Sequence, residues 1–355
     1  MSRRAFLIAC VGTTLACLVL GVLQLQCSEV AGFAFSLEQV GRGLQALVGH
    51  ADPLPGTDQA VLELRLWRTL TAAGVGACLG VGGAMLQGLF RNGLAEPALL
   101  GVSGGANLGA ALALMALYGY GNSVLAAPAG VSATVLVTGA AFAGALLTSA
   151  LVLLIARGDG QLDVVRLLLV GVAMNTVILG VLVALHSLLL PDPELSRALR
   201  TWTFGSLDGR LPVHAAMVGA GALVLSVAIP FVATELDLFA GGEDDARALG
   251  VRTGVTKLLV VLATAFATAC AFAAAGQVAF VGLVVPHVLR LLTGPSHRTL
   301  LPMSLVGGAV MVLGLDLLQL AVLGRRPLHT GVLMSVIGGP FFLVLLARAG
   351  RVGAW

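Results

Sequence analysis

Apolar runs of about 20 residues recur along this chain and are separated by short polar segments. A run of that length can cross a hydrocarbon layer of roughly 30 Å as a helix. We expect ten spans with approximate boundaries 5–25, 68–89, 98–118, 127–155, 164–190, 212–233, 255–275, 277–293, 302–322 and 331–348. The pattern predicts an all-α polytopic membrane protein of about ten transmembrane helices, organised as one transmembrane domain over residues 1–355.

The first run follows Arg3 and Arg4, so it fits either a cleaved signal peptide or a first span. We favour an uncleaved span, because the run is long and no clear cleavage site of small residues follows it. Segments 27–67 and 191–210 are too polar to cross a membrane, although residues 37–49 carry a modest helical pattern. We expect both polar segments on the outer side.

Composition supports a membrane protein, since 58% of the residues are hydrophobic, 10% are charged and the mean hydropathy is +1.01. A soluble domain could not cover so much apolar surface with polar groups. The 47 glycines favour close approach of helices in lipid. The five cysteines lie mostly in apolar runs without a CxxC spacing, so we interpret them as small buried hydrophobic residues. The formal net charge of +3 is small, and we expect no nucleic-acid partner.

An even number of spans places both termini on one side. If that side is the cytoplasm, 12 of the 20 basic residues lie inside, namely Arg3, Arg4, Arg91, Arg157, Arg166, Arg247, Arg252, Lys257, Arg290, Arg298, Arg348 and Arg351. The remaining eight lie outside, at Arg42, Arg65, Arg68, Arg197, Arg200, Arg210, Arg325 and Arg326. This distribution follows the positive-inside rule only weakly.

Acidic residues concentrate in segment 235–251, between the sixth and seventh spans. Five of the 17 acidic residues lie there, at Glu235, Asp237, Glu243, Asp244 and Asp245. The last three follow two glycines and crowd a predicted helix first turn, where the macrodipole favours negative charge. Gly250 fits the position after the helix end. Such a short helix is not stable alone in water, so it must rest on the membrane domain or on a partner; a solvated loop is the alternative.

The chain lacks the phosphate-binding loop of ATPases. Lys257 is its only lysine and follows Thr256, so no GxxxxGK[ST] sequence exists. If ATP drives a process here, a separate polypeptide hydrolyses it, and a short charged helix is a natural docking place. We expect no catalytic residues, no stably bound cofactor and no stable metal site, because the six histidines show no HxxH or HExxH pairing.

Four segments together resemble one family. The stretches "LFRNGLAEPALLGVSGGANLG" (89–109) and "GQVAFVGLVVPHVLRLLTGPSHRTLLP" (276–302) resemble two signatures of the membrane-spanning subunits of iron-chelate, haem and cobalamin ATP-binding cassette importers. Segment 235–251 resembles the family's coupling segment, and 331–346 resembles its last span. The similarity runs from about residue 60 to the C-terminus. Gly93 and His329 depart from the pattern, because both stand where proline is common.

The resemblance implies an importer permease rather than an enzyme. It implies a homodimer with a central pathway, two copies of a P-loop ATPase subunit, and a periplasmic binding protein that delivers the ligand. It also implies a multi-pass protein of the bacterial inner membrane with both termini in the cytoplasm. The predicted contacts with the ATPase are Glu243, Asp244, Asp245, Ala246, Arg247, Leu249 and Gly250.

Two pairs of outer arginines are candidates for docking of the binding protein. Arg65 and Arg68 open the second predicted span in a sequence that resembles the family's LRLPRTL, where arginines contact acidic residues of the binding protein. Arg325 and Arg326 precede the last span, and we group them with the first pair. Arginine pairs bidentately with carboxylates. The alternative is that these side chains anchor the protein to lipid headgroups.

Several single polar residues lie in or beside spans. Asn92, Glu96 and His329 are pathway candidates, with capping of the third span as the alternative for the first two. For Asp316 we favour a hydrogen bond to a neighbouring helix over the proton relay of an ion-coupled carrier. For His287, which follows a proline, we favour a helix-breaking role over metal or haem ligation.

The sequence predicts a large, partly apolar ligand. We favour haem, because the "IGGPFF" end (337–342) and the outer histidine are slightly closer to haem-type members of the family. A ferric siderophore or cobalamin is the alternative within the same role. A secondary transporter driven by ions is a more distant alternative.

Overall fold

Helices account for nearly all of the described chain. The computed structural model describes residues 3–27, 35–118, 131–158, 161–189, 199–200, 202–323 and 328–349. The helices are α1 (Arg3–Gln26), α2 (Leu37–Leu47), α3 (Asp58–Phe90), η1 (Pro97–Leu100), α4 (Val102–Tyr118), α5 (Val131–Ala156), α6 (Val164–Leu189), α8 (Pro212–Phe239), α9 (Glu243–Ala248), α10 (Thr253–Ala275), α11 (Val281–Thr293), α12 (His297–Leu323) and α13 (Thr330–Ala349). Strands β1 (Arg157–Gly158) and β2 (Gln161–Leu162) form a small antiparallel hairpin between α5 and α6.

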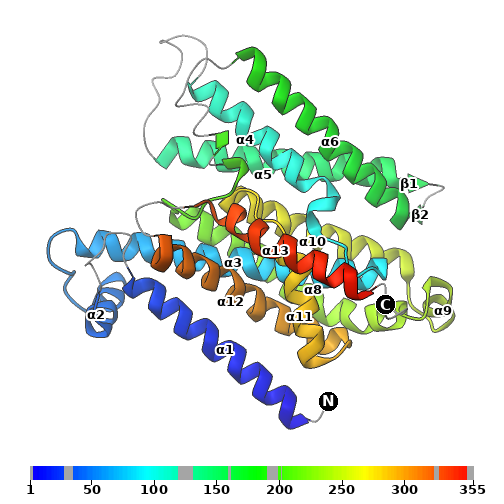
Figure 1. The fold of residues 1–355 in the computed structure, drawn as a ribbon, viewed down its shortest axis with the longest axis horizontal. Helices are drawn as coiled ribbons and strands as arrows, with labels where there is room; N and C mark the ends of the chain where they lie inside the picture. Colours follow the sequence, from blue (N-terminus) through cyan, green and yellow to red (C-terminus); the bar gives the residue numbers. More distant parts are fainter. Residues whose placement is uncertain are drawn as a thin grey trace.

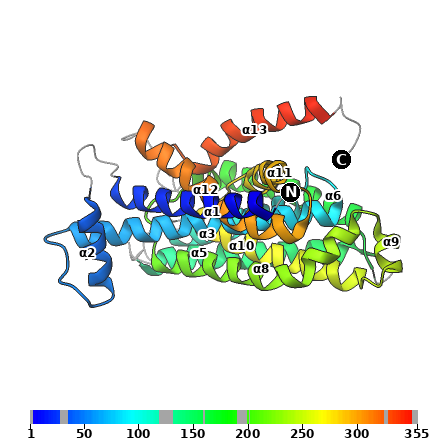
Figure 2. The same ribbon diagram turned by 90° about the horizontal axis from the view of Figure 1, so that it is seen from below.

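The long helices run between two ends of the molecule, with α2 at one end and α9 at the other (Figures 1 and 2). Helices α4, α5 and α6 form one group, drawn at the top of Figure 1, and α6 packs on α4, α5 and η1. Helix α10 connects this group to the other helices, because it packs on α3 and α8 as well as on α4 and α5. Helix α1 begins, and α13 ends, toward the α9 end.

The ten predicted spans are present in the expected order. Seven helices, α1, α3, α5, α6, α8, α10 and α12, are long and apolar enough to cross a membrane, and α4, α11 and α13 contain shorter apolar helices. An all-α polytopic membrane protein of about ten helices is therefore confirmed. The helical pattern expected over 37–49 also forms, as α2, whose Ser36 N-cap and Gln39 make a reciprocal capping box.

The largest boundary error concerns the second span, which begins at Asp58 rather than near residue 68. Leu62, on an early turn of α3, is fully buried in a small cluster with Leu25, Phe35, Val40 and Leu54. The early turns of α3 therefore pack on α1 and α2, and their polar residues did not reveal that contact in the sequence.

Helix α3 is the central helix of the domain, in contact with α12, α10, α8, α11 and α1. Its glycines allow this crowding. A Cβ at Gly76 would collide with the carbonyl oxygen of Gly308 on α12, so the two backbones touch at this point. Gly105 on α4 meets Gly144 on α5 in the same way. Small residues that let helix backbones approach are the expected means of association in lipid, and the prediction of close glycine packing is confirmed.

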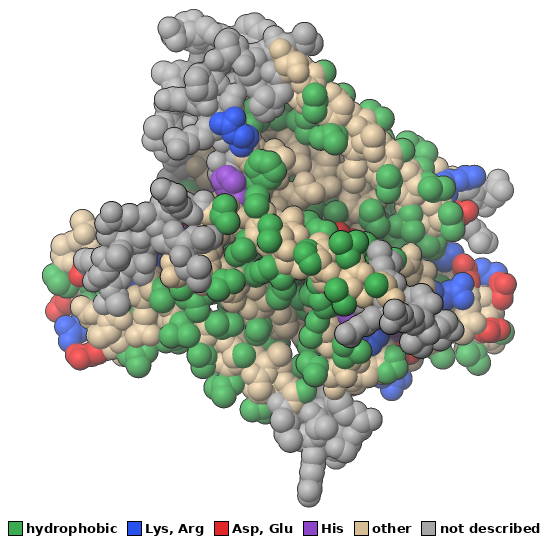
Figure 3. All heavy atoms as spheres, in the orientation of Figure 1, with side chains coloured by type: hydrophobic (Ala, Val, Ile, Leu, Met, Phe, Trp, Pro, Cys, Tyr) green, Lys and Arg blue, Asp and Glu red, His purple; other side chains and the backbone are tan. Residues whose placement is uncertain are grey.

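Charged side chains gather at the two ends of the face shown in Figure 3, over α2 and over α9 with the β1–β2 hairpin. Hydrophobic side chains cover much of the surface between them. This distribution suits a bilayer whose apolar core contacts the middle of the molecule.

One ion-pair network is buried among α1, α3 and α12. Arg68 on α3 is 7% exposed. It donates two hydrogen bonds to Asp316 on α12, from Nε to Oδ2 at 2.8 Å and from Nη2 to Oδ1 at 2.9 Å. Its Nη1 lies 2.8 Å from Oδ1 of Asp208. The amide of Gln24 on α1 also donates to Oδ2 of Asp316. The prediction that Asp316 bonds to neighbouring helices is confirmed.

The same network corrects the expectation for Arg68. An exposed arginine at the start of a span was expected to meet a docking partner, but Arg68 lies within α3 and its guanidinium is committed to two carboxylates of its own chain. The sequence could not reveal this, because Asp316 lies 248 positions away.

We predict that this network stabilises the fold and that its charges depend on one another. Arg68→Met leaves Asp316 buried without its cation, which should destabilise the protein by about 3–5 kcal/mol. Adding Asp316→Leu should recover most of that loss, because the uncompensated charge is gone. Thermal unfolding in detergent, followed by circular dichroism, measures both effects.

The matched control is Arg42→Met, which breaks the exposed Arg42–Glu38 pair of α2 and should change stability by less than about 1 kcal/mol. Equal destabilisation by the buried and the exposed variant, or additive losses in the double variant, would contradict the prediction.

Candidate functional site

Helix α9 is a short, strongly acidic helix between α8 and α10. Gly242 precedes it with φ +128°, a conformation that L side chains rarely adopt, and Glu243, Asp244 and Asp245 fill its first turn. The helix ends at Ala248, and Gly250 follows with φ +91°. The predicted helix and the predicted role of Gly250 are therefore confirmed, and the alternative of an ordinary loop is wrong.

The acidic segment divides between two elements with different contacts. Glu235 and Asp237 belong to the last turns of α8, which extends to Phe239 rather than ending near residue 233. Asp237 accepts hydrogen bonds from the backbone N–H of His297 at 2.7 Å and from the hydroxyl of Ser296 at 2.8 Å. It also lies 2.8 Å from Nδ1 of His297. Asp237 thus caps the start of α12, and only the second half of the acidic segment forms α9.

Helix α9 is seated on its own membrane domain by one buried apolar contact and by one cation of α10, Lys257. Ala246 is completely buried. Glu243 lies 2.6 Å from Nζ of Lys257 and 3.2 Å from Nη2 of Arg247. The Lys257 ammonium also donates to the carbonyl oxygen of Leu162 in the β1–β2 hairpin, at 3.2 Å. In the sequence this lysine excluded a P-loop and counted among the basic residues expected inside, and neither use indicated that its ammonium is buried.

The opposite face of this region is exposed and partly apolar. Leu249 is 68% exposed, and the side chain of Asp244 is 98% exposed. Leu249 also lines a groove of about 490 Å³ between the end of α8 and the start of α10, together with Phe231, Leu238, Arg252 and Val255. An exposed leucine beside an open apolar groove, at the polar end of a membrane domain, is a surface suited to a protein partner.

These positions correct the expectation for Ala246. It was grouped with Leu249 as a contact for a partner, but its side chain points into its own domain. A helix of six residues is too short for its pattern of apolar positions to distinguish the inner from the outer face.

Asp163 lies between strand β2 and the first residue of α6. Its Oδ1 accepts hydrogen bonds from the backbone N–H groups of Arg166 at 3.1 Å and Val165 at 2.8 Å. The bond from Arg166 is the largest influence that holds the pKa of this carboxyl below its usual range. Asp163 therefore remains ionised at neutral pH and fixes the start of α6 directly after the hairpin.

The pathway candidates Asn92 and Glu96 both cap backbone groups. The Asn92 side chain accepts from the N–H of Leu94 at 2.9 Å and closes a local turn. Glu96 accepts from the N–H of Phe280 at 2.6 Å, directly before α11. Capping was the expected alternative for these residues, but the helix that Glu96 caps is α11 rather than the third span. Phe280 has φ +65°, so this contact stabilises an uncommon backbone conformation.

His329 lies at a second hollow, near the start of α13 and toward the α2 end. Its ring stacks on that of Phe204, with a centroid distance of 6.1 Å and an interplanar angle of 18°. Phe204 is 46% exposed and lines an opening of about 490 Å³ together with Thr203, Gln277, Ser335 and Val336. No sequence pattern pointed to Phe204, because its exposure depends on how segment 202–210 folds over the end of α10.

His287 is not at a helix break. Helix α11 continues through Pro286 to Thr293, so the expected helix-breaking role is wrong, and the His287 ring meets Phe341 of α13 edge-on at 5.9 Å. Within the described ranges, no group of three or more His, Cys, Asp or Glu side chains is placed to hold a metal ion.

Arg65 has contacts within its own chain. Its Nη1 donates to the carbonyl oxygens of Leu25 at 3.0 Å and Gln26 at 3.2 Å, and its guanidinium lies 4.7 Å from the centre of the Phe35 ring. It therefore satisfies the end of α1, where helix carbonyls lack partners. Arg325 and Arg326 lie outside the described residues.

These features define a multi-pass α-helical membrane protein with a short charged helix seated at one end. Residues 7–348 match the FecCD transport family, and the chain belongs to that family.

Its curated relatives cover several ligands. The chain is 37% identical to the cobalamin import system permease BtuC of Halobacterium salinarum, over 84% of this chain and 78% of the relative. It is 37% identical to the hemin transport system permease HmuU of Yersinia pestis, over 81% and 83%. It is 36% identical to the ferric enterobactin transport system permease FepD of Escherichia coli, over 83% and 84%.

Among solved structures, the chain resembles a metal-chelate type ABC transporter in an inward-facing conformation. The TM-score is 0.77 at 25% identity, and the match covers 97% of this chain and 99% of that one. The chain is thus a permease of the ABC importer class for metal chelates, in which ATP hydrolysis belongs to another subunit.

We predict opposite consequences for two similar substitutions at α9. Ala246→Asp places a carboxylate in a fully buried position, which should destabilise the isolated chain by several kcal/mol. Leu249→Asp places the same group on an exposed position and should leave stability within about 0.5 kcal/mol of the parent. Thermal unfolding of the two purified variants in detergent compares them directly, and a stable Ala246→Asp protein would contradict the assigned orientation of α9.

Proposed function

We propose that this chain is the membrane-spanning subunit of an ABC importer that moves haem from a periplasmic binding protein into the cytoplasm. Two copies form the pathway as a homodimer, and each copy receives one ATPase subunit. The observation that carries the coupling role is the exposed Leu249 beside a helix firmly seated on the membrane domain. A displacement imposed on such a helix passes to the membrane domain instead of bending a loose loop.

The proposed orientation places the α9 end in the cytoplasm and the α2 end in the periplasm. Helix α9 and the β1–β2 hairpin gather many of the basic residues expected inside, and α1 begins and α13 ends toward the same end. Glu243, Asp244, Asp245, Arg247, Leu249 and Gly250 remain the proposed coupling set, while Ala246 supports α9 from within.

The ligand preference for haem rests on His329 and its neighbour Phe204. A stacked imidazole and phenyl pair beside an opening of about 490 Å³ offers a flat, partly apolar surface to an aromatic macrocycle. The relatives include permeases named for cobalamin, hemin and ferric enterobactin, so a cobalamin or siderophore ligand is the alternative within the same role.

An ion-coupled carrier is disfavoured by the surroundings of Asp316. Its carboxylate is held by the guanidinium of Arg68 and the amide of Gln24, and it is completely buried. A relay carboxylate must exchange protons with water during transport, whereas both oxygens of Asp316 are bonded to Arg68 and the side chain has no access to water.

We predict ATP-dependent uptake of haem by the assembled complex. Proteoliposomes that contain this chain, its ATPase and its binding protein should import haem faster than cobalamin or a ferric siderophore, and the chain alone should hydrolyse no ATP. His329→Ala should slow haem uptake by roughly fivefold if the ring contributes about 1 kcal/mol to ligand passage.

Leu249→Asp is the companion variant. It should still fold but should lose co-purification with the ATPase, because a carboxylate would be buried at the interface. Uptake of cobalamin or siderophore with no uptake of haem would refute the ligand assignment alone. Normal assembly and uptake by Leu249→Asp would refute the coupling role.

We predict that Arg325 and Arg326 speed docking of the binding protein. Charges at the rim of an interface act mainly on encounter rate and its salt dependence. Arg325→Glu with Arg326→Glu should therefore slow association, and should flatten its dependence on ionic strength, while basal ATPase activity survives. Stopped-flow association at several salt concentrations measures this.

Arg65 remains a proposed docking residue, although its bonds to the end of α1 mean that its substitution would also disturb the fold. The two outer arginines at 325–326 are therefore the cleaner test. An unaltered salt profile in the double variant would instead assign them to lipid headgroups.

A further inference from the structure

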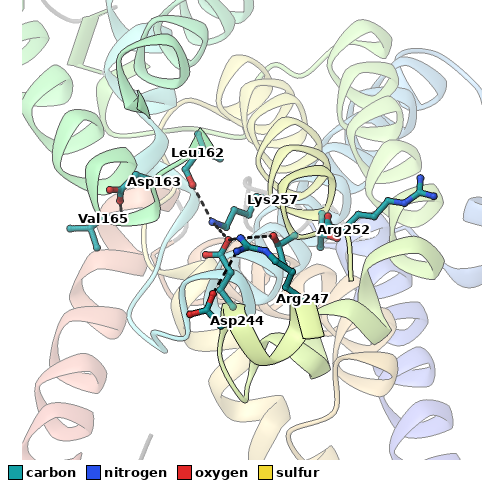
Figure 4. Close-up of polar contacts among 10 residues, drawn as sticks. Leu162, Asp163, Val165, Asp244, Arg247, Arg252 and Lys257 are labelled. Carbon is teal, nitrogen blue, oxygen red and sulfur yellow. Dashed lines mark hydrogen bonds and ion pairs between the residues drawn. The ribbon is translucent and has the colours of Figure 1, made fainter. Parts of the chain in front are cut away.

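Lys257 lies where three elements meet at the α9 end of the molecule. It belongs to the first turns of α10, its side chain is only 6% exposed, and Glu243 of α9 lies 2.6 Å from its Nζ. The same Nζ donates to the carbonyl oxygen of Leu162 in β2, at 3.2 Å (Figure 4). One buried ammonium thus joins the short charged helix to the turn between α5 and α6.

We propose that Lys257 is a positioning residue that makes α9 and the α5–α6 turn move as one unit, so that a displacement of α9 by the ATPase reaches α6. This inference rests on the proposed function, since it assumes that the ATPase acts on α9.

The burial of Lys257 makes this link stiff. An ammonium removed from water must keep its hydrogen-bond acceptors, because an uncompensated buried charge is costly. Its described acceptors are one carboxylate and one carbonyl, which lie on two different elements. If α9 shifts, the ammonium either follows Glu243 and pulls on Leu162, or loses an acceptor. A solvent-exposed pair such as Arg247 with Asp244 carries no such penalty, since water replaces the lost partner.

The link also reaches α6, a helix with many exposed apolar side chains at one side of the bundle (Figure 1). Helix α6 packs on α4, α5 and η1, and it lies in the group that Figure 1 draws apart from α12 and α13. Several of its apolar residues face outward, including Val165 at 65% exposure and Leu169 at 66%. Asp163 caps its first turn immediately after Leu162. A pull on the Leu162 carbonyl therefore acts on the start of α6 with one residue between them.

The test uses Lys257→Met in the complete complex with the ATPase and the binding protein. Methionine keeps the apolar length of the side chain, and Glu243 keeps Arg247 as its partner, so no buried charge is orphaned. We expect normal assembly and ATP hydrolysis, but about fivefold more ATP consumed per ligand imported, the lower range of coupling between sites. Lys257→Arg should restore much of the parent ratio, because it can reach both acceptors. Thr264→Val, two turns further along α10, is the control for loss of a buried polar group from the same helix.

A second readout separates a mechanical link from simple support of the fold. Spin labels on the exposed positions Ala248 and Val165, in a background without the five native cysteines, report the separation of α9 and α6. On nucleotide binding this separation should stay constant in the parent complex and change in Lys257→Met.

Three results would overturn the inference: a parent-like ratio of ATP to ligand in Lys257→Met, an unchanged label separation in that variant, or failure of both Lys257→Met and Lys257→Arg to assemble. A parent complex that imports nothing with ATP would instead overturn the proposed function itself.

Discussion

Close contact between helix backbones at α3 is the constraint on which the rest of this structure depends. Where Gly76 meets Gly308, no side chain separates α3 from α12, and similar contacts occur between α4 and α5. In lipid, such packing supplies the attraction that hydrophobic burial supplies in water. The helices that pack on α3, namely α12, α10, α8, α11 and α1, therefore have a narrow range of permitted positions relative to it. The polar contacts at the two ends of the bundle act on helices whose spacing is already fixed.

Those polar contacts share one arrangement, in which a charged group of one helix satisfies the end or side of another. Arg68 joins α3 to Asp316 of α12, Asp237 of α8 caps α12, and Glu243 of α9 meets Lys257 of α10. Each buried charge is matched by an opposite charge or by backbone groups, as the low dielectric of the interior requires. The few ionisable residues of this apolar chain thus define register between helices, and several fall near the membrane boundaries.

The number, order and type of the membrane helices could be predicted from the sequence, because each depends on a local run of apolar residues. Contacts that join distant positions could not. Arg68 looked like an exposed docking residue because its partner is 248 positions away. Ala246 and Leu249 looked equivalent because six residues of helix do not establish a face. Glu96 was expected to cap a helix and does so. Its target, Phe280, could not be predicted, because it depends on a tertiary contact between two loops. The expected break at Pro286 was wrong because α11 tolerates the proline within a packed helix.

The inner and outer sides of α9 have different roles. A helix of six residues has no stability of its own, so whatever holds it must come from its neighbours. Ala246 and Glu243 contact the membrane domain on the inner side of α9, and Leu249 and Asp244 face outward. If the inner contacts were loose, a partner bound to the outer face would move α9 alone. The motion would then only bend the segments that connect α9 to α8 and α10. Because the inner contacts are the buried side chain of Ala246 and an ion pair to the buried ammonium of Lys257, the smallest unit that moves includes the start of α10 and the hairpin before α6. The apolar groove beside Leu249 then lies on a rigid surface, which is the condition for work done there to reach the opposite end of the membrane domain.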